Sequence, residues 1–230
     1  AEVSIPNLDS FNSQDLASTA WAFSRADYFA PALFSAIAET SIRKLDSFSA
    51  EHLAKTAWAF ARLGNVAPAL FSAIADAAVE KLTDFNLQDL TNTAWAFACI
   101  GWSRYSIFGA ILSEALTRQD SFDVQQRSQL HLVFLHFQLE FPDQVFPLAH
   151  IQEKLQSAYQ FQESTVSQFQ RDVAAVLDRI GWKHVLNHRS PEGLLLNTAQ
   201  PGKKHAIEID GTSHYLLNTR NENGRTRFKS

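Results

Sequence analysis

The sequence predicts an α-solenoid of helix-hairpin repeats followed by a small α/β domain. A tryptophan recurs every 37 residues, at Trp21, Trp58 and Trp95. Residues 11–47 match residues 48–84 at 20 of 37 positions, and residues 85–121 match that middle unit at 13. Fixed periods of this length are typical of stacked helical repeats. From residue 160 onward the periodicity stops, and one amphipathic helix with three short apolar segments replaces it.

Four units make up the predicted array over residues 1–159. Three are complete, at residues 11–47, 48–84 and 85–121, and a degenerate fourth covers 122–159. Because a single helix pair cannot bury its apolar face alone, stacked neighbours are expected to share one continuous core.

Each unit is predicted to hold two helices. In the first unit these are Ser13–Arg25 and Ala32–Leu45, with Pro31 in the first turn of the second helix. Gly64 and Gly101 lie where the first helix of their unit should end.

Apolar and polar positions separate on the first helix of each unit. Leu16, Ala20 and Phe23 form one stripe, and we expect the motif Thr19–Phe23, including its tryptophan, to pack in the core. Gln14, Ser18 and Arg25 fall on the opposite side at ~100° per residue. Their equivalents are Glu51, Lys55 and Arg62, then Gln88, Asn92 and Cys99, then Gln125, Gln129 and His136.

These polar positions change from unit to unit, whereas the core positions hardly change. In helical repeats that read RNA one base per unit, two or three such side chains make the contacts. An ordinary solvent-facing surface gives the same pattern. The candidate RNA-binding residues in the repeats are Gln14, Ser18, Arg25, Lys55, Arg62, Gln88, Asn92 and Gln129.

The second predicted domain covers residues 160–230. It is expected to contain a helix at Thr165–Ile180 and strands at Trp182–Leu186, Leu194–Thr198 and His205–Ile209. Strand alternation places Glu208 and Asp210 on one face. Two carboxylates in this arrangement could bind a divalent metal, or they could simply mark the end of the strand.

Charge is distributed unevenly along the chain. Residues 1–122 contain 8 Lys or Arg against 13 Asp or Glu, whereas residues 183–230 contain 8 against 4. Because phosphate neutralisation dominates nucleic-acid affinity, the C-terminal end is the better place for RNA. The candidate residues there are Lys183, His188, Arg189, Lys203, Lys204, His214, Arg220, Arg225 and Arg227. A solvated loop face has the same composition.

Composition excludes some classes of protein. No apolar run approaches the ~20 residues that cross a bilayer. Cys99 is the single cysteine, which excludes an internal disulfide and zinc sites of the CxxC type. Because the chain has no Met, we expect it to be a processed or partial chain, in which any targeting segment is missing.

Residues 165–230 resemble the RAP domain, an RNA-binding domain of organellar proteins. The resemblance rests on Leu177, Gly181, Trp182 and Gly193, and above all on the run from Ile207 to Tyr215. The units with Thr-Ala-Trp-Ala-Phe resemble the heptatricopeptide repeats that commonly precede RAP domains. The resemblance implies a restriction-endonuclease-like fold and an organellar protein, mitochondrial or else plastid, acting in RNA stability, processing or ribosome assembly. The family usually continues beyond Ser230, so the domain is expected to be incomplete.

The same resemblance raises the alternative of a metal-dependent RNA endonuclease. Related nuclease folds use an Asp on the second strand and Glu-x-Lys on the third, around magnesium. Here those places fall at Asn197, Glu208 and Asp210. Because two of the three depart from the nuclease pattern, we expect no enzyme, no metal and no cofactor.

The sequence therefore favours an organellar RNA-binding protein that contacts rRNA or mRNA and no membrane. A component of an organellar ribosome, bound to ribosomal proteins, is a variant of this interpretation. A protein-only scaffold is the remaining alternative.

Overall fold

The computed structural model describes residues 8–160, 166–191, 193–209 and Asn218. The first three units each contribute a pair of helices of 13 residues. The first helices are α1 (Ser13–Arg25), α3 (Ala50–Arg62) and α5 (Leu87–Cys99), and the second are α2 (Pro31–Arg43), α4 (Pro68–Glu80) and α6 (Tyr105–Thr117). The fourth unit has a longer first helix, α7 (Val124–Glu140), and a short second helix, α8 (Gln152–Gln160). The helical repeat is thus confirmed.

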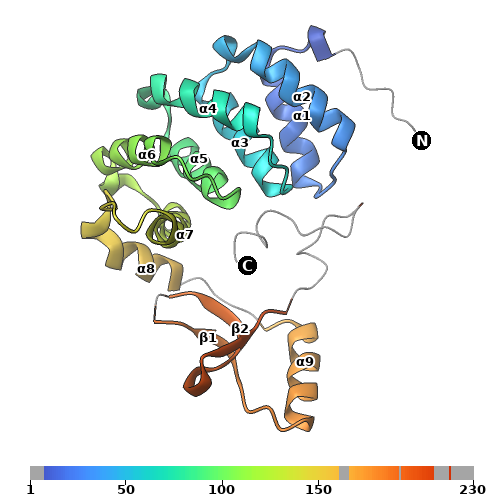
Figure 1. Cartoon of the computed structure of the whole chain (residues 1–230), viewed down its shortest axis with the longest axis vertical. Coiled ribbons are helices and arrows are strands. Elements are labelled where there is room, and N and C mark those ends of the chain that lie inside the picture. The colour runs from blue at the N-terminus through green and yellow to red at the C-terminus, as the bar shows by residue number, and fades with distance from the viewer. Residues whose placement is uncertain (1–7, 161–165, 192, 210–217, 219–230) are drawn as a thin grey trace.

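The helices form two layers. Helices α1, α3, α5 and α7 pack side by side in sequence order, and α2, α4 and α6 form a second row. Figure 1 shows the array as an arc with the first helices along its inner side. A single core runs the length of the arc because each unit buries its apolar stripe against the next.

Helix boundaries repeat with the same 37-residue period. The N-cap residues are Asn12, Ser49, Asn86 and Asp123, and each side chain accepts a hydrogen bond from a backbone N–H in the first turn. Gly64 and Gly101 follow α3 and α5 in the left-handed region, both with φ of +66°, as the sequence predicts. Asp27 takes this place in the first unit, with φ of +48°.

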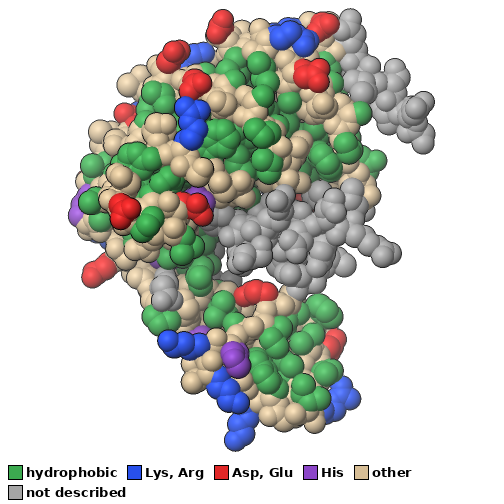
Figure 2. Space-filling view, in the orientation of Figure 1, with side chains coloured by type: hydrophobic (Ala, Val, Ile, Leu, Met, Phe, Trp, Pro, Cys, Tyr) green, Lys and Arg blue, Asp and Glu red, His purple; other side chains and the backbone are tan. Residues whose placement is uncertain are grey.

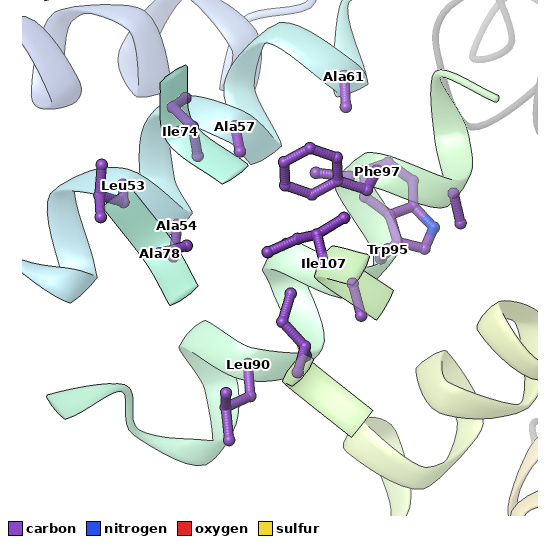
Figure 3. Packing of buried hydrophobic residues seen from close by; sticks show 14 of the residues in the cluster. Leu53, Ala54, Ala57, Ala61, Ile74, Ala78, Leu90, Trp95, Phe97 and Ile107 are labelled. Atoms are coloured by element: carbon purple, nitrogen blue, oxygen red, sulfur yellow. The ribbon is translucent and has the colours of Figure 1, made fainter. Parts of the chain in front are cut away.

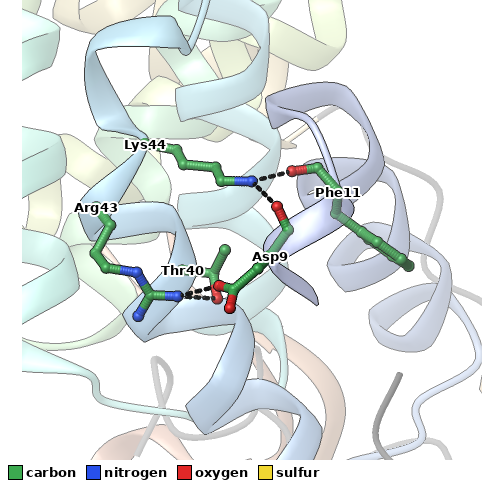
Figure 4. A network of polar contacts seen from close by, with 5 residues as sticks. All are labelled: Asp9, Phe11, Thr40, Arg43 and Lys44. Atoms are coloured by element: carbon green, nitrogen blue, oxygen red, sulfur yellow. Dashed lines mark hydrogen bonds and ion pairs between the residues drawn. The ribbon is translucent and has the colours of Figure 1, made fainter. Parts of the chain in front are cut away.

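Helix α2 ends at Arg43, two residues before its predicted end. Leu45 instead begins a short 3-10 turn that leads to the next unit. A basic residue follows each second helix and binds the start of its own unit. Lys44 donates to the carbonyl oxygens of Asp9 and Phe11, and Arg43 pairs with the Asp9 carboxylate (Figure 4). Lys81 and Arg118 repeat the Lys44 contact at Phe48 and Phe85.

Aromatic and aliphatic side chains alternate with small residues in the core. Phe97 packs edge-on against Phe71, with ring centroids 5.4 Å apart, and lies next to Ile107 (Figure 3). Leu53 and Leu90 are fully buried, as is Ala57. The alanines on the first helices permit the close approach of neighbouring units.

The C-terminal part consists of α9 (Gln168–Arg179) and an antiparallel sheet in the order β1–β2–β3. The strands are β1 (Val185–Arg189), β2 (Leu195–Gln200) and β3 (His205–Ile207). Residue Val185 pairs with Ala199, and Thr198 pairs with Ile207.

Five of the six predicted strand ends were wrong, and side-chain contacts lie at two of them. Strand β1 begins three residues after the predicted start because Trp182 stacks on His184, with ring centroids 5.6 Å apart. Strand β3 ends at Ile207 because the backbone N–H of Ile209 donates to the side chain of Asn197, at 2.7 Å, instead of continuing the ladder. Glu208 therefore follows the strand and does not lie within it.

The C-terminal part contacts both ends of the array. Gln156 on α8 donates to the Pro191 carbonyl oxygen at 3.1 Å. Gly193 is buried with φ of +92°, and a Cβ added there would lie only 3.2 Å from both Gln156 and His131. At the other end, Asn218 exchanges two hydrogen bonds with the backbone of Phe29, which lies between α1 and α2.

Candidate nucleic-acid interface

The candidate RNA-reading positions form three rows, which are Gln14, Ser18 and Arg25 with their equivalents in the later units. The first two rows lie on the inner helices. Gln14 and Ser18 are exposed on α1. Lys55 forms an ion pair with Glu51 one turn away, and this contact lowers the pKa of the Glu51 carboxyl. The structure places the remaining residues of these rows on α5 and α7.

Polar contacts link the α5 and α7 positions. Gln88 donates to Asn92 at 2.9 Å, and Gln129 reaches the same oxygen from α7 at 3.4 Å. Gln125 is exposed. The contact between Gln129 and Asn92 therefore extends this polar surface across the boundary between the third and fourth units.

The third row differs from the first two because side chains in it contact the preceding unit. Arg62 donates to the Ser24 carbonyl oxygen at 3.0 Å and pairs with Asp27 at 2.9 Å. Cys99 repeats the backbone contact at the Ala61 carbonyl oxygen. His136 is half-buried, and burial lowers its pKa. Arg62 therefore has a structural contact that the sequence prediction did not foresee.

The expected burial of the recurring tryptophans was wrong for the first of them. Trp95 is 7% exposed and Trp58 is half-buried, whereas Trp21 is 42% exposed. The rings of Trp58 and Trp95 lie 6.2 Å apart. Sequence reasoning placed these rings in the core, but at ~100° per residue Trp21 falls among the polar positions of α1.

Basic side chains of the array are mostly engaged by protein oxygens. Seven of the eight in residues 1–122 donate to a carbonyl, hydroxyl or carboxylate: Arg43, Lys44, Lys55, Arg62, Lys81, Arg104 and Arg118. Among the described residues Arg25 is the exception, and its guanidinium lies 5.6 Å from the centre of the Trp21 ring.

An acidic hollow lies between the N-termini of α3 and α5. Glu51, Asp84 and Asp89 line it together with Lys81. Burial raises the pKa of Asp89. Because three carboxyl groups surround one cation, this hollow is unsuited to phosphate.

The C-terminal part carries a basic pocket instead. Lys183 and Lys203 line it, together with His184 at the start of the sheet. Gln200 fixes the pocket by donating to the Lys183 carbonyl oxygen at 2.6 Å. Figure 2 shows Lys and Arg side chains gathered on this part of the surface. The fold thus brings together two lysines that are 20 residues apart in the sequence.

The other predicted basic residues of this part are distributed around the sheet. His188 and Arg189 lie on β1, and Lys204 follows Lys203 in the left-handed region with φ of +53°. Four further candidates, together with Asp210, lie outside the described residues: His214, Arg220, Arg225 and Arg227.

The two described positions of the nuclease alternative, Asn197 and Glu208, both accept hydrogen bonds from backbone N–H groups. Glu208 accepts from the backbone N–H of Asn197 at 3.4 Å, and the Asn197 side chain accepts from the N–H of Ile209. Within the described residues no group of three or more His, Cys, Asp or Glu side chains has the arrangement of a metal site. The described helices also include none with the length and hydropathy to cross a membrane.

A protein-family comparison matches residues 4–168 to the model described as RNA-editing substrate-binding complex 6 protein. The match covers the four helical units. The chain belongs to the RNA-editing substrate-binding complex 6 family. No curated protein matches the chain. As a member of this RNA-associated family the protein has an RNA-related function, and the family name refers to an assembly, which points to RNA and protein partners.

The matched range ends at the first residue of α9. The basic pocket of this RNA-editing substrate-binding complex 6 family member lies beyond it. The family assignment therefore rests on the helical array.

Proposed function

We propose that this protein is a non-catalytic RNA-binding component of an organellar RNA-processing complex, with a mitochondrial location favoured over a plastid one. The family supports a role in RNA processing with protein partners. The resemblance of the C-terminal part to the RAP domain supports an organelle and RNA contact. Binding of rRNA within an organellar ribosome is the variant with the same chemistry.

The basic pocket is the observation that carries the proposal. The array is acidic, and seven of its eight basic side chains in residues 1–122 already contact protein oxygens. Lys183 and Lys203 are instead exposed and both contribute to the lining of one pocket in the basic part of the chain. RNA phosphates are therefore expected to bind there, while the polar inner surface of the array faces the bases.

Salt dependence tests this proposal. We expect single-stranded RNA to bind the full chain with an affinity that falls steeply as salt rises. The double substitution Lys183→Ala and Lys203→Ala should weaken binding and reduce the slope of log affinity against log salt by about 0.7 for each lost phosphate contact. The measurement is fluorescence anisotropy across a salt series.

Lys154→Ala is the matched control, because Lys154 is an exposed lysine on α8, away from the pocket. It removes the same charge as Lys203→Ala and should leave the slope unchanged. An equal effect of both single substitutions would assign the binding to net charge and not to the pocket. Absence of RNA binding at low salt would favour the protein-only scaffold.

The nuclease alternative makes a separate prediction. An endonuclease would cleave RNA in magnesium and lose that activity in Glu208→Gln. We propose that no such cleavage occurs, because Asn197 is a weaker metal ligand than a carboxylate and Asp210 cannot supply the positive charge of the Lys in the nuclease pattern.

A further inference from the structure

We propose that Trp21 and Arg25 form a nucleobase-stacking site at the N-terminal end of the inner surface. The inference rests on the proposed RNA-binding function and adds the place where a base is held. Both side chains lie on α1, one turn apart, with the guanidinium 5.6 Å from the ring centre.

The equivalent pair in the second unit, Trp58 and Arg62, has different surroundings. Arg62 lies 5.4 Å from the centre of the Trp58 ring, so the same pair is built twice. There the guanidinium is held by Ser24 and Asp27 of the preceding unit. Its side chain is only 20% exposed. That pair is part of the contact between repeats.

In the first unit the equivalent pair is exposed instead. Trp21 is 42% exposed, six times the exposed fraction of Trp95 at the third position of the row. Arg25 is exposed as well and has no ion pair within the part of the chain that the structure describes. An indole and a guanidinium are thus held together at the surface of the part of the chain that the structure describes.

The chemistry of this pair fits a base of single-stranded RNA. Aromatic rings and guanidinium planes stack on bases, and each such contact contributes enough to change affinity roughly 5- to 100-fold. A positive charge beside the ring also suits the neighbouring phosphate, which an uncharged aromatic would not attract. Gln14 and Ser18 continue the exposed surface along the same helix with hydrogen-bonding groups.

The site is close to the C-terminal part of the chain. Asn218 binds the backbone of Phe29, only four residues after Arg25. A strand of RNA held through phosphates in the C-terminal part therefore has the first repeat within the same molecule as a second point of contact.

The test compares two probes on the full chain: a mixed-sequence single-stranded RNA, and an abasic ribose-phosphate chain of equal length. Wild-type protein should prefer the RNA, because only the RNA has bases to stack. Trp21→Leu should lose roughly 5-fold or more of RNA affinity while its affinity for the abasic chain stays unchanged. Leucine is a suitable replacement because Leu132 occupies this position in the fourth unit.

Two further variants sharpen the result. Arg25→Lys keeps the charge and removes the planar guanidinium. It should therefore lower the preference for RNA over the abasic chain and leave the slope of log affinity against log salt unchanged. Tyr105→Leu changes an aromatic side chain of similar exposure, 38%, on the second-layer helix α6, and should change neither affinity.

The outcomes separate this inference from the proposed function. Equal affinity of the wild type for both probes, or unchanged RNA affinity in a folded Trp21→Leu protein, would overturn the stacking site and leave phosphate binding intact. Failure of both probes to bind at low salt would overturn the proposed function itself. Circular dichroism of each variant confirms that the helices are retained.

Discussion

At the scale of single residues, identical positions in successive units have different surroundings. Arg25 is exposed and lies over the Trp21 ring, whereas Arg62 forms an ion pair with Asp27 of the preceding unit. His136 continues this row on α7, where its ring lies 5.6 Å from Phe108. The surroundings of a unit therefore decide whether a side chain supports the fold or meets the solvent.

His136 gives a prediction about pH. Burial lowers its pKa below 6.5, although nearby Glu140 acts in the opposite direction. The folded protein thus favours the neutral ring. Stability is complete above the unfolded pKa of about 6.5 and falls as the pH decreases through that value, by at most about 1.4 kcal/mol per pH unit for one proton.

His136→Gln should remove this component. The free energy of unfolding, measured by urea denaturation between pH 7.5 and pH 5, should fall less steeply in the variant than in the wild type. Parallel curves for the two proteins would show that the folded and unfolded pKa values of His136 are the same.

At the scale of elements, the turns between units are held by a recurring cation. Lys81 follows α4 and donates to the carbonyl oxygens of Phe48, at 2.6 Å, and Asp46, at 3.3 Å. Lys44 and Arg118 do the same in the neighbouring units. These cations therefore satisfy backbone groups at turns that lack helical partners.

Lys81→Met should destabilise the protein by about 1–3 kcal/mol, because the methionine keeps the aliphatic stem and leaves both carbonyl oxygens without the charged donor. Lys81→Arg is the matched control, since Arg118 already makes this contact in the third unit. Chemical denaturation measures both. A methionine variant as stable as the wild type would mean that solvent replaces the contact without loss.

At the scale of the whole molecule, the fold combines an acidic array with a basic C-terminal part. The two meet at the fourth unit, where Gln156 binds Pro191 and Gly193 packs against His131. They meet again at the first unit through Asn218 and Phe29. The polar inner surface and the basic pocket are therefore held within one molecule by contacts at both ends of the array.

Gly193→Ala should disrupt the contact at the fourth unit. A Cβ there meets both Gln156 and His131 at 3.2 Å, and φ of +92° is unfavourable for any L side chain. Hydrogen exchange should show loss of protection in β1 and β2, with the protection of α3 and α5 unchanged.

Gly181→Ala separates the two causes. It has φ of +74° but no atom within 4 Å of the added Cβ, so it carries only the backbone cost of about 1 kcal/mol. Equal loss of protection in both variants would show that the contact with α7 and α8 contributes little.

The sequence by itself determined the repeat and its local geometry. The 37-residue period, the helix Ser13–Arg25 and the left-handed glycines were all predicted, because helix periodicity and capping depend on residues close in the chain. The strand boundaries near Trp182 and Ile209 were missed because side-chain contacts end the ladder there.

Only the tertiary structure decided which repeated residues are available to a partner. Trp21 and Trp95 are the same residue at the same position of their units, yet Trp21 is 42% exposed and Trp95 is 7% exposed. Lys183 and Lys203 likewise share a pocket only because the sheet folds back on itself. Burial and convergence depend on neighbours distant in the chain, and the local pattern of residues does not contain that information.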